Sequence, residues 1–197
     1  MINPNDITNY HRTEGELQEF LLFCVMCAGK SSTVQAQKLS HFLSLFSKRP
    51  GWTPFERLRG LSKESMLRYL KEAKVGKYKL IGDCIWLISP AHGLCDLHTW
   101  NLDPHEKRKA LIKCPGIGIK TASLFLLHSE RDSRMAVLDT HLLKYLRKLY
   151  PKARVPKASP QSMDRYMELE DMWLGYCYRN GYDPATHDLD IWKEKAA

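Results

Sequence analysis

Apolar residues recur three or four positions apart along most of the chain, a spacing typical of helices that bury one face. Asp103 and Asp183 each precede a proline. Such a pair favours a helix start, because the carboxylate accepts hydrogen bonds from the first amides and the proline ring fixes a helical dihedral angle. We expect Ser62 to cap a further helix, the helix after Asp103 to run to Cys114, and RPGWTP (residues 49–54) to interrupt the helices. Stretches of β-branched residues are too short to predict a sheet. We therefore expect an all-α fold.

The 197-residue chain is 44% hydrophobic, which is enough for one sizeable domain or two small ones. We find no signal-peptide pattern at residues 1–16 and no apolar run near the roughly twenty residues that cross a membrane. We expect an intracellular protein of the cytoplasm or nucleoid, or of the nucleus if the organism is eukaryotic. A formal charge of +8 favours a polyanionic partner, nucleic acid before an anionic membrane.

Six cysteines are spread through apolar segments, and we expect free thiols. Cys24 and Cys27 form a C-x-x-C pair inside an apolar helical run, where packing in the core is favoured over a redox or metal role. The histidines show no metal-ligand spacing with the cysteines, so we expect no zinc site.

A glycine-rich turn joins two helix-like runs in the segment LIKCPGIGIKTASLFLLHSE, residues 111–130. Gly116 and Gly118 carry no side chains, so consecutive amides of the turn and the next helix start can face a phosphate. Such a hairpin grips a nucleic-acid backbone without reading its sequence. A plain helix–helix turn that needs glycine only for its geometry is the alternative.

Lys120 and Asp139 are the candidate catalytic pair. Lys120 falls in the first turn of a helix, where the dipole disfavours a cation, so we expect its neutral amine to be accessible as a nucleophile. Asp139 precedes a helical run and can cap it, and its carboxylate could stabilise positive charge on a sugar and assist proton transfer. The alternatives are a lysine that contacts phosphate and an aspartate that only caps a helix.

CPGIGIKTA followed by VLDTHLLKYL resembles the helix-hairpin-helix and Gly-Pro-Asp (HhH-GPD) region of the DNA glycosylase superfamily that includes endonuclease III and 8-oxoguanine DNA glycosylase. The match covers about residues 104–147, and LLFCVMCAGKSS and VGKYKLIGDC resemble upstream parts more loosely. The resemblance implies a two-lobed helical fold with a DNA cleft between the lobes. The implied lobes are residues 30–135, with the hairpin at 104–129, and residues 1–29 plus 136–197.

The resemblance also implies a bifunctional DNA N-glycosylase and abasic-site lyase, because Lys120 and Asp139 match the positions of the nucleophile and the aspartate. It places a DNA phosphate at Gly116, Gly118 and Lys120. Relatives can bind a monovalent cation through backbone carbonyls that match Ile112, Cys114 and Ile117. Base-pocket or wedge positions match Gly29, Lys77 and Tyr78, and Trp192 and Trp173 are candidates for stacking on the flipped base, although Trp173 fits a core position better.

Departures from the family pattern bear on the substrate. Only Cys177 lies beyond Asp139, so the four-cysteine iron–sulfur cluster of endonuclease III is not expected, and no cofactor is required. Gly29 replaces a glutamine of endonuclease III, and its carbonyl could accept from N7–H of 8-oxoguanine. We expect a monomer that excises 8-oxoguanine from double-stranded DNA. An endonuclease III-like activity on oxidised pyrimidines and a non-catalytic DNA-binding module are the alternatives.

Overall fold

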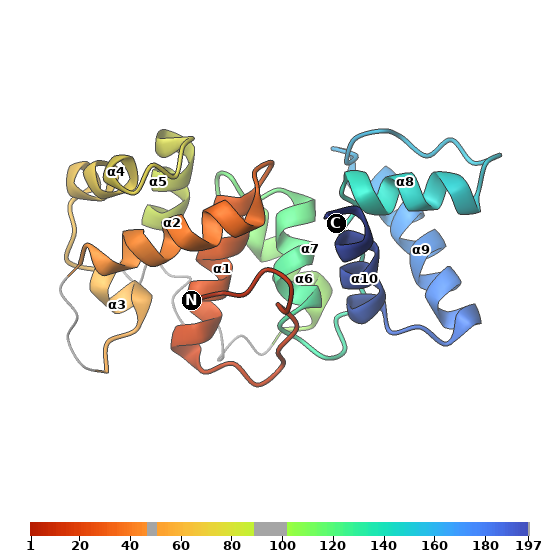
Figure 1. Ribbon diagram of the computed structural model, residues 1–197, viewed down its shortest axis with the longest axis horizontal. Helices are drawn as coiled ribbons and strands as arrows, with labels where there is room; N and C mark the ends of the chain where they lie inside the picture. Colours follow the sequence, from red (N-terminus) through yellow and green to blue (C-terminus); the bar gives the residue numbers. More distant parts are fainter. Residues whose placement is uncertain (47–50, 89–101, 197) are drawn as a thin grey trace. The chain divides into compact units, whose positions relative to one another are not determined.

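The computed structural model describes residues 1–46, 51–88 and 102–196, and regular structure within them is entirely helical (Figure 1). This confirms the all-α expectation. The helices are α1 (Glu14–Cys27), α2 (Ser32–Ser44), α3 (Pro54–Leu58), α4 (Lys63–Glu72), α5 (Tyr78–Ile88), α6 (Pro104–Leu111), α7 (Ile119–Leu127), α8 (Thr140–Leu149), α9 (Met163–Asn180) and α10 (Pro184–Ala196). None of these helices is long and apolar enough to cross a membrane.

The chain forms two compact units. The first comprises Met1–Ile7 and His11–Ile117, and the second comprises Thr8–Tyr10 and Gly118–Ala197. The grouping implied by the family resemblance differs, because it joins residues 1–29 to the C-terminal helices. In the structure α1 instead contacts α2, α3 and α5. The physical reason is that α1 is buried on almost every side and needs neighbours all around it.

Residues with local capping chemistry begin several helices at the predicted positions. Ser62 accepts from the amide of Ser65 at the start of α4. Asp103 accepts from the amides of His105 and Glu106 at the start of α6, and Asp183 accepts from the amide of Thr186 in α10. These bonds satisfy amides that have no partner inside the helix.

One helix end and one whole helix differ from expectation. The sequence predicts that the helix after Asp103 runs to Cys114, but α6 ends at Leu111, because the amides of residues 113 and 114 bond three residues back and close a tight turn. The sequence around residue 53 predicts an interruption between helices, yet this segment begins α3. Thr53 and Glu56 build a capping box there, with Pro54 in the first turn.

A central helix, α1, organises the first unit. Phe20, Leu21 and Leu22 in its middle are fully buried, and α2, α3 and α5 pack around it (Figure 1). The buried Gln18 amide bridges two helices: its oxygen accepts from the amide of Phe55 at 2.9 Å, and its nitrogen donates to Glu14 at 2.7 Å. This bridge fixes α3 against α1.

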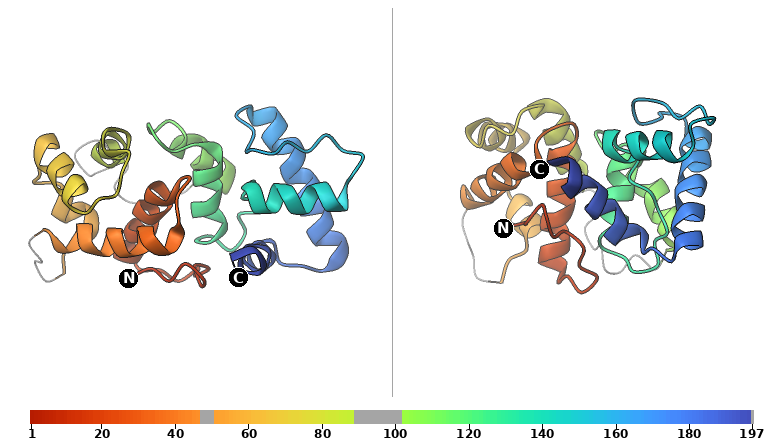
Figure 2. Two further views of the ribbon diagram at one scale, coloured as in Figure 1. Left: turned by 45° about the horizontal axis from the view of Figure 1, so that its top comes forward. Right: turned by 45° about the vertical axis from the view of Figure 1, so that its right-hand side comes forward.

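The second unit has its own core. Leu142, Leu143 and Leu146 on one face of α8 pack against Leu169 and Trp173 of α9. Trp173 is fully buried there, so the core interpretation of this tryptophan is correct. Helix α10 lies beside α8 (Figure 2). Asp139 therefore lies at the start of a helix, α8, that is packed into the core of the second unit.

Candidate active site

The turn before α7 uses its glycines in different ways. Gly116 has a φ of +88°, and an added Cβ would lie 3.2 Å from Leu80 Cγ, so the fold itself requires glycine. Gly118 is the N-cap of α7 with φ −86° and ψ 172°, which any residue can adopt, and a Cβ there would meet no atom within 4 Å. Nothing in the fold of the described residues demands glycine at position 118.

The N-cap of α7, Gly118, has no side chain to bond the first amides of the helix. Among the described residues, no side-chain bond caps this helix start. Lys120 is the second residue of α7 and is half-buried. Its ammonium has no hydrogen-bond or ion-pair partner among the described residues. The first turn of α7 therefore combines an N-cap without a side-chain bond with a lysine that has no partner among the described residues, and the roles of Lys120 as phosphate ligand and nucleophile stay predictions.

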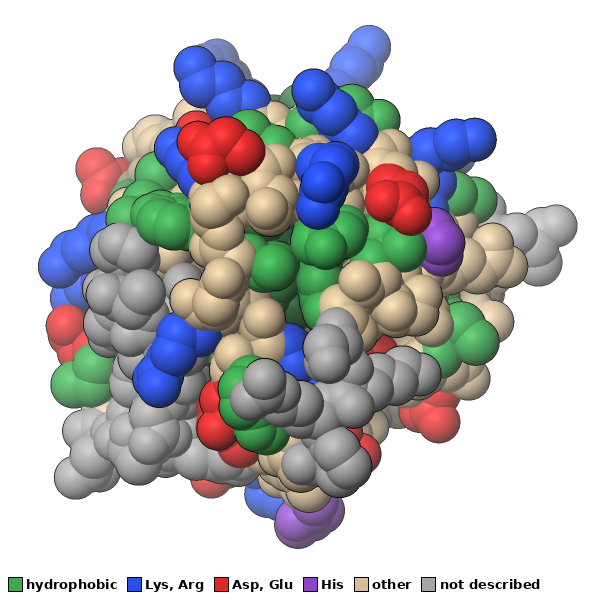
Figure 3. Space-filling view, turned by 90° about the vertical axis from the view of Figure 1, so that its left-hand side faces the viewer, with side chains coloured by type: hydrophobic (Ala, Val, Ile, Leu, Met, Phe, Trp, Pro, Cys, Tyr) green, Lys and Arg blue, Asp and Glu red, His purple; other side chains and the backbone are tan. Residues whose placement is uncertain are grey.

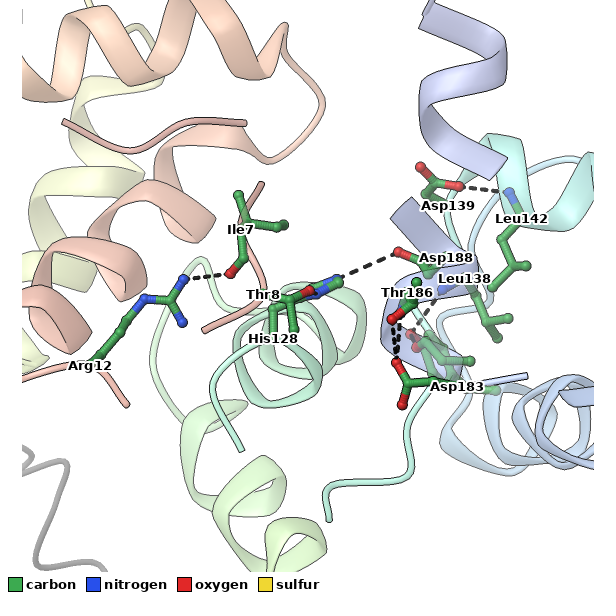
Figure 4. Close-up of polar contacts among 12 residues, drawn as sticks. Ile7, Thr8, Arg12, His128, Leu138, Asp139, Leu142, Asp183, Thr186 and Asp188 are labelled. Atoms are coloured by element: carbon green, nitrogen blue, oxygen red, sulfur yellow. Dashed lines mark hydrogen bonds and ion pairs between the residues drawn. The ribbon is translucent and has the colours of Figure 1, made fainter. Parts of the chain in front are cut away.

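Asp139 is the N-cap of α8, as the sequence predicts. Its Oδ1 accepts from the amides of His141 and Leu142, both at 2.8 Å (Figure 4). Both bonds end on the same oxygen, so Oδ2 takes no part in the cap. No bond joins Asp139 to Lys120 among the described residues, although both lie in the second unit.

Two side chains of α9 hold the segment that leads into Asp139. The hydroxyl of Tyr166 donates to the carbonyl of Ala136 at 2.7 Å and accepts from the amide of Leu138 at 3.3 Å. The buried carboxylate of Glu170 accepts from the amide of Ala136 at 2.8 Å. These bonds hold residues 136–138, which precede Asp139, and the cap bonds join Asp139 to the start of α8 that follows it.

The structure brings together two predicted pocket residues from distant parts of the sequence. Lys77 Nζ donates to the carbonyl of Ala28 at 3.2 Å and lies 3.8 Å from the place of a Cβ on Gly29. Gly29 and Lys77 both have positive φ values, +70° and +49°. Glycine adopts such a φ readily, whereas at Lys77 it is a strained conformation of the kind that gathers at functional sites. Tyr78 follows as the first residue of α5 and is half-buried.

Lys30 is a residue of this region that sequence reasoning missed. Its ammonium donates to the carbonyls of Val75 and Gly76, in the loop that carries Lys77. Burial lowers the pKa of Lys30, and the nearby charges of Lys77 and Lys38 lower it further. A sequence cannot distinguish this lysine from the other basic residues, because the loop that it binds is about forty-five positions away.

The remaining predicted positions are placed as follows. Trp192 is half-buried on α10, next to the core residue Ile191. Of the carbonyls predicted to bind a cation, that of Cys114 accepts from the amide of Ile117 at 3.1 Å inside the turn. The cation site formed by Ile112, Cys114 and Ile117 stays a prediction.

The described cysteines are free thiols, as expected. Cys24 is buried and burial raises its pKa well above the ordinary value, so it is inert in the core. No group of three or more His, Cys, Asp or Glu side chains in the described part of the chain could hold a metal ion. Cys95 lies outside the described residues.

Basic side chains are mixed with side chains of other kinds on the face of the molecule that Figure 3 draws. Figure 3 shows Lys and Arg side chains spread over one face of the molecule, with acidic and apolar side chains between them. The formal charge of +8 is therefore consistent with a nucleic-acid partner without locating it on that face.

A buried histidine and a second carboxylate lie near Asp139, and neither follows from the sequence pattern. His128, at the end of α7, is fully buried; its Nδ1 is 2.8 Å from Thr8 Oγ1 and its Nε2 is 3.6 Å from Asp188 Oδ2 (Figure 4). Burial raises the pKa of Asp188, the nearby His128 opposes this shift, and the Asp139 carboxylate adds to it.

Comparison with known proteins places the fold. No protein-family model matches this chain, and no curated protein matches it significantly. Among solved structures, the Methanocaldococcus jannaschii 8-oxoguanine glycosylase/lyase bound to 8-oxoguanine DNA is 21% identical with a TM-score of 0.72, over 94% of this chain and 83% of that one.

Two further solved structures have a similar fold. The 8-oxoguanine DNA glycosylase of Thermotoga maritima is 24% identical with a TM-score of 0.68, over 91% of this chain and 79% of that one. The apo Clostridium acetobutylicum 8-oxoguanine glycosylase/lyase is 16% identical with a TM-score of 0.65, over 89% and 59% of the two chains. This chain shares the helical fold of 8-oxoguanine DNA glycosylases.

Proposed function

We propose that this protein is a bifunctional DNA glycosylase and abasic-site lyase of base excision repair, with 8-oxoguanine as its substrate. The observation that carries the proposal is Lys120: a half-buried lysine without a partner among the described residues, in the first turn of α7 directly after the uncapped Gly118. The shared fold with glycosylase/lyase structures supports the assignment.

In the proposed reaction the damaged nucleotide is flipped out of the duplex, because its anomeric carbon is out of reach inside the stack. The neutral Lys120 amine attacks C1′, the bond from C1′ to the base breaks, and the base leaves with the bonding electrons and takes up a proton. Asp139 stabilises the positive charge on the sugar and accepts the proton that the lysine nitrogen loses. The C1′–O4′ bond of the sugar then breaks, O4′ takes up a proton, and the C1′=N Schiff base forms. Loss of a proton from C2′ breaks the bond from C3′ to oxygen and releases the 3′ phosphate by β-elimination.

The amides of residues 116–120 bind a phosphate beside the target nucleotide in this proposal. Gly118 supports it, since the fold leaves open space where its side chain would be. The carbonyl at Gly29 accepts the N7 hydrogen that distinguishes 8-oxoguanine from guanine. Lys77, which has a positive φ that is uncommon for a residue other than glycine, donates to the carbonyl of Ala28 beside Gly29 and supports a role for this loop.

Borohydride trapping tests the nucleophile. Wild-type protein should form a covalent adduct with an 8-oxoguanine duplex and with an abasic duplex, whereas Lys120→Ala should form none and cleave no strand. Lys113→Ala, which removes an exposed lysine from the same hairpin, is the matched control and should keep the adduct. Strand cleavage by Lys120→Ala would disprove the Schiff-base mechanism, and a wild type without any adduct would favour a non-catalytic DNA-binding module.

Substitution of Asp139 separates catalysis from capping. Asparagine caps a helix about as well as aspartate, so Asp139→Asn keeps the α8 start and removes only the charge. We expect base release to slow severely with DNA binding largely retained, because the charge acts in the transition state. If Asp139→Asn retained wild-type rates while Asp139→Ala lost stability, the aspartate would be a structural cap only.

The damaged base is tested with a panel of duplexes. Each contains 8-oxoguanine, thymine glycol, uracil or an alkylated purine, opposite each of the four normal bases. We expect release of 8-oxoguanine to be the fastest under single-turnover conditions. A preference for thymine glycol would make oxidised pyrimidines the substrates in place of 8-oxoguanine. The proposed chemistry of Lys120 would be unchanged.

A further inference from the structure

The segment 140–162 carries positive charge without any negative charge. It contains six Lys and Arg residues and no Asp or Glu, and it spans α8 and the loop that leads to α9. These six account for most of the excess of basic over acidic residues in the chain, 30 against 22. Helix α9 has mixed signs, since Asp164, Arg165 and Glu168 lie in its first two turns. Positive charge is therefore concentrated in one part of the second unit.

Five of these six cations are exposed, and the sixth, Arg147, is half-buried. The exposed ones lie on α8 and on the loop after it, and together they are called the α8 basic surface: Lys144, Lys148, Lys152, Arg154 and Lys157. None of these five side chains forms a hydrogen bond or an ion pair with another described residue. The fold of the described residues therefore leaves five cations able to meet an external anion.

The loop that carries three of the five cations is held against α8. Arg147 Nη1 donates to the carbonyl of Pro156 at 2.6 Å, and Arg165 of α9 donates to the carbonyl of Arg154. Val155, between these two bonded positions, is buried in the core that α8 and α9 share. The loop therefore runs back alongside α8 and presents its cations from a fixed backbone (Figure 1).

Local stability explains only part of this charge. Cations in the last turn of a helix are favoured by the helix dipole, which accounts for Arg147 and Lys148. The dipole acts only within that turn, so it does not account for Lys152, Arg154 or Lys157 in the loop. Like charges held close together repel one another, and solubility needs net charge but not charge of one sign in one place. A polyanionic partner relieves this repulsion.

We propose that the α8 basic surface binds the phosphate backbone of double-stranded DNA, in addition to the phosphate site proposed at the start of α7. Helix geometry places Lys144 and Lys148 about 8 and 14 Å along α8 from its cap, Asp139, and phosphates of one strand repeat about every 3.4 Å along a duplex. The two lysines are therefore within reach of phosphates about two to four base pairs from a nucleotide at Asp139. This comparison rests on the proposed function, but the binding itself requires no reaction.

Contacts to phosphate carry no sequence information, so the surface should hold damaged and undamaged duplexes alike. The affinity of the whole protein for an undamaged duplex is measured by fluorescence anisotropy over a series of salt concentrations. Each phosphate contact adds about 0.9 to the slope of log affinity against log salt concentration. The loop variant Lys152→Gln/Arg154→Gln/Lys157→Gln should lose about two to three units of slope, and the helix variant Lys144→Gln/Lys148→Gln about one to two.

A matched control removes the same number of charges elsewhere. The variant Arg59→Gln/Arg68→Gln/Lys71→Gln neutralises three exposed cations of the first unit and should keep the wild-type slope. Trapping of the adduct with an abasic duplex at saturating protein should proceed at the wild-type rate in the loop variant, because the surface binds DNA without touching a reacting atom. The loop and helix variants are separate proteins, so either one tests the inference if the other fails to fold.

The outcomes separate this inference from the proposed function. Smaller slopes in the loop and helix variants with an unchanged control support it. Wild-type slopes in both variants, or an equal loss of slope in the control, overturn it. Binding to phosphatidylserine vesicles that the loop variant loses, with its DNA slope unchanged, also overturns it, because this result assigns the surface to a membrane. If wild type forms no adduct with any duplex, the proposed function fails, while the salt dependence still decides whether the surface binds DNA.

Discussion

Alanine at Gly116 and at Gly118 should separate folding from DNA binding. At Gly116 an L-residue must adopt φ +88°, which costs about 1–2 kcal/mol, and its Cβ must displace Leu80 from 3.2 Å. We therefore expect Gly116→Ala to lose about 2 kcal/mol of unfolding free energy, or roughly 4–8 °C in melting temperature for a chain of this size.

Gly118→Ala should behave in the opposite way. Alanine is a poorer N-cap than glycine, but it also restricts the unfolded chain, and the two effects of about 0.5–1 kcal/mol nearly cancel. Its methyl group points into open space and would stand where a phosphate approaches the α7 amides. Losing one charge-assisted amide bond costs about 1.5 kcal/mol, which corresponds to roughly tenfold weaker binding.

Both variants are measured by thermal unfolding and by fluorescence anisotropy with a duplex that contains a stable abasic analogue, at one fixed salt concentration. The expected pattern is a destabilised Gly116→Ala and a stable Gly118→Ala that binds DNA weakly. Wild-type affinity in Gly118→Ala would refute phosphate binding at this helix start. An unchanged melting temperature in Gly116→Ala would refute the packing argument.

Three further predictions concern stability. Lys30→Met removes the donor to the carbonyls of residues 75–76 and should cost about 1 kcal/mol in urea denaturation. Burial raises the pKa of the Cys84 thiol from 9.0 to about 12, so the thiol loses its proton at a lower pH in the unfolded chain than in the folded one. The free energy of unfolding should therefore fall as pH rises across this range, and it should fall less in Cys84→Ala. Trp173→Ala should cost about 3–5 kcal/mol, whereas Trp173→Phe should cost far less, because the buried indole N–H has no hydrogen-bond partner among the described residues.

Helix starts with capping side chains could be predicted from the sequence, whereas the end of α6 could not. Asp103, Asp183 and Ser62 carry their capping chemistry in one side chain, and the structure uses all of them. The end of α6 at Leu111 depends instead on a turn whose bonds run between backbone groups of any residue type. The only sequence signal for a helix end in that region is Pro115, and it predicts an end later than the observed one at Leu111.

The candidate site divides in the same way. Lys120 and Asp139 are visible in the sequence because their positions relative to glycine, proline and apolar runs give each a local role. The approach of Lys77 to Gly29 is a tertiary contact across forty-eight positions, and the sequence predicts the residues but not their meeting. His128 and Asp188 carry no local signal, since a histidine in an apolar segment is an ordinary core residue.

The proposed chemistry and the proposed base recognition belong to different units. Lys120 and Asp139 lie in the second unit, whereas Gly29 and Lys77 lie in the first. An abasic site has already lost its base, so in the proposed mechanism its cleavage requires the lysine chemistry and no base selection. Substitutions in the Gly29 loop should therefore alter which base is released and leave the adduct with an abasic duplex unchanged. Substitutions at Lys120 should abolish both base release and this adduct.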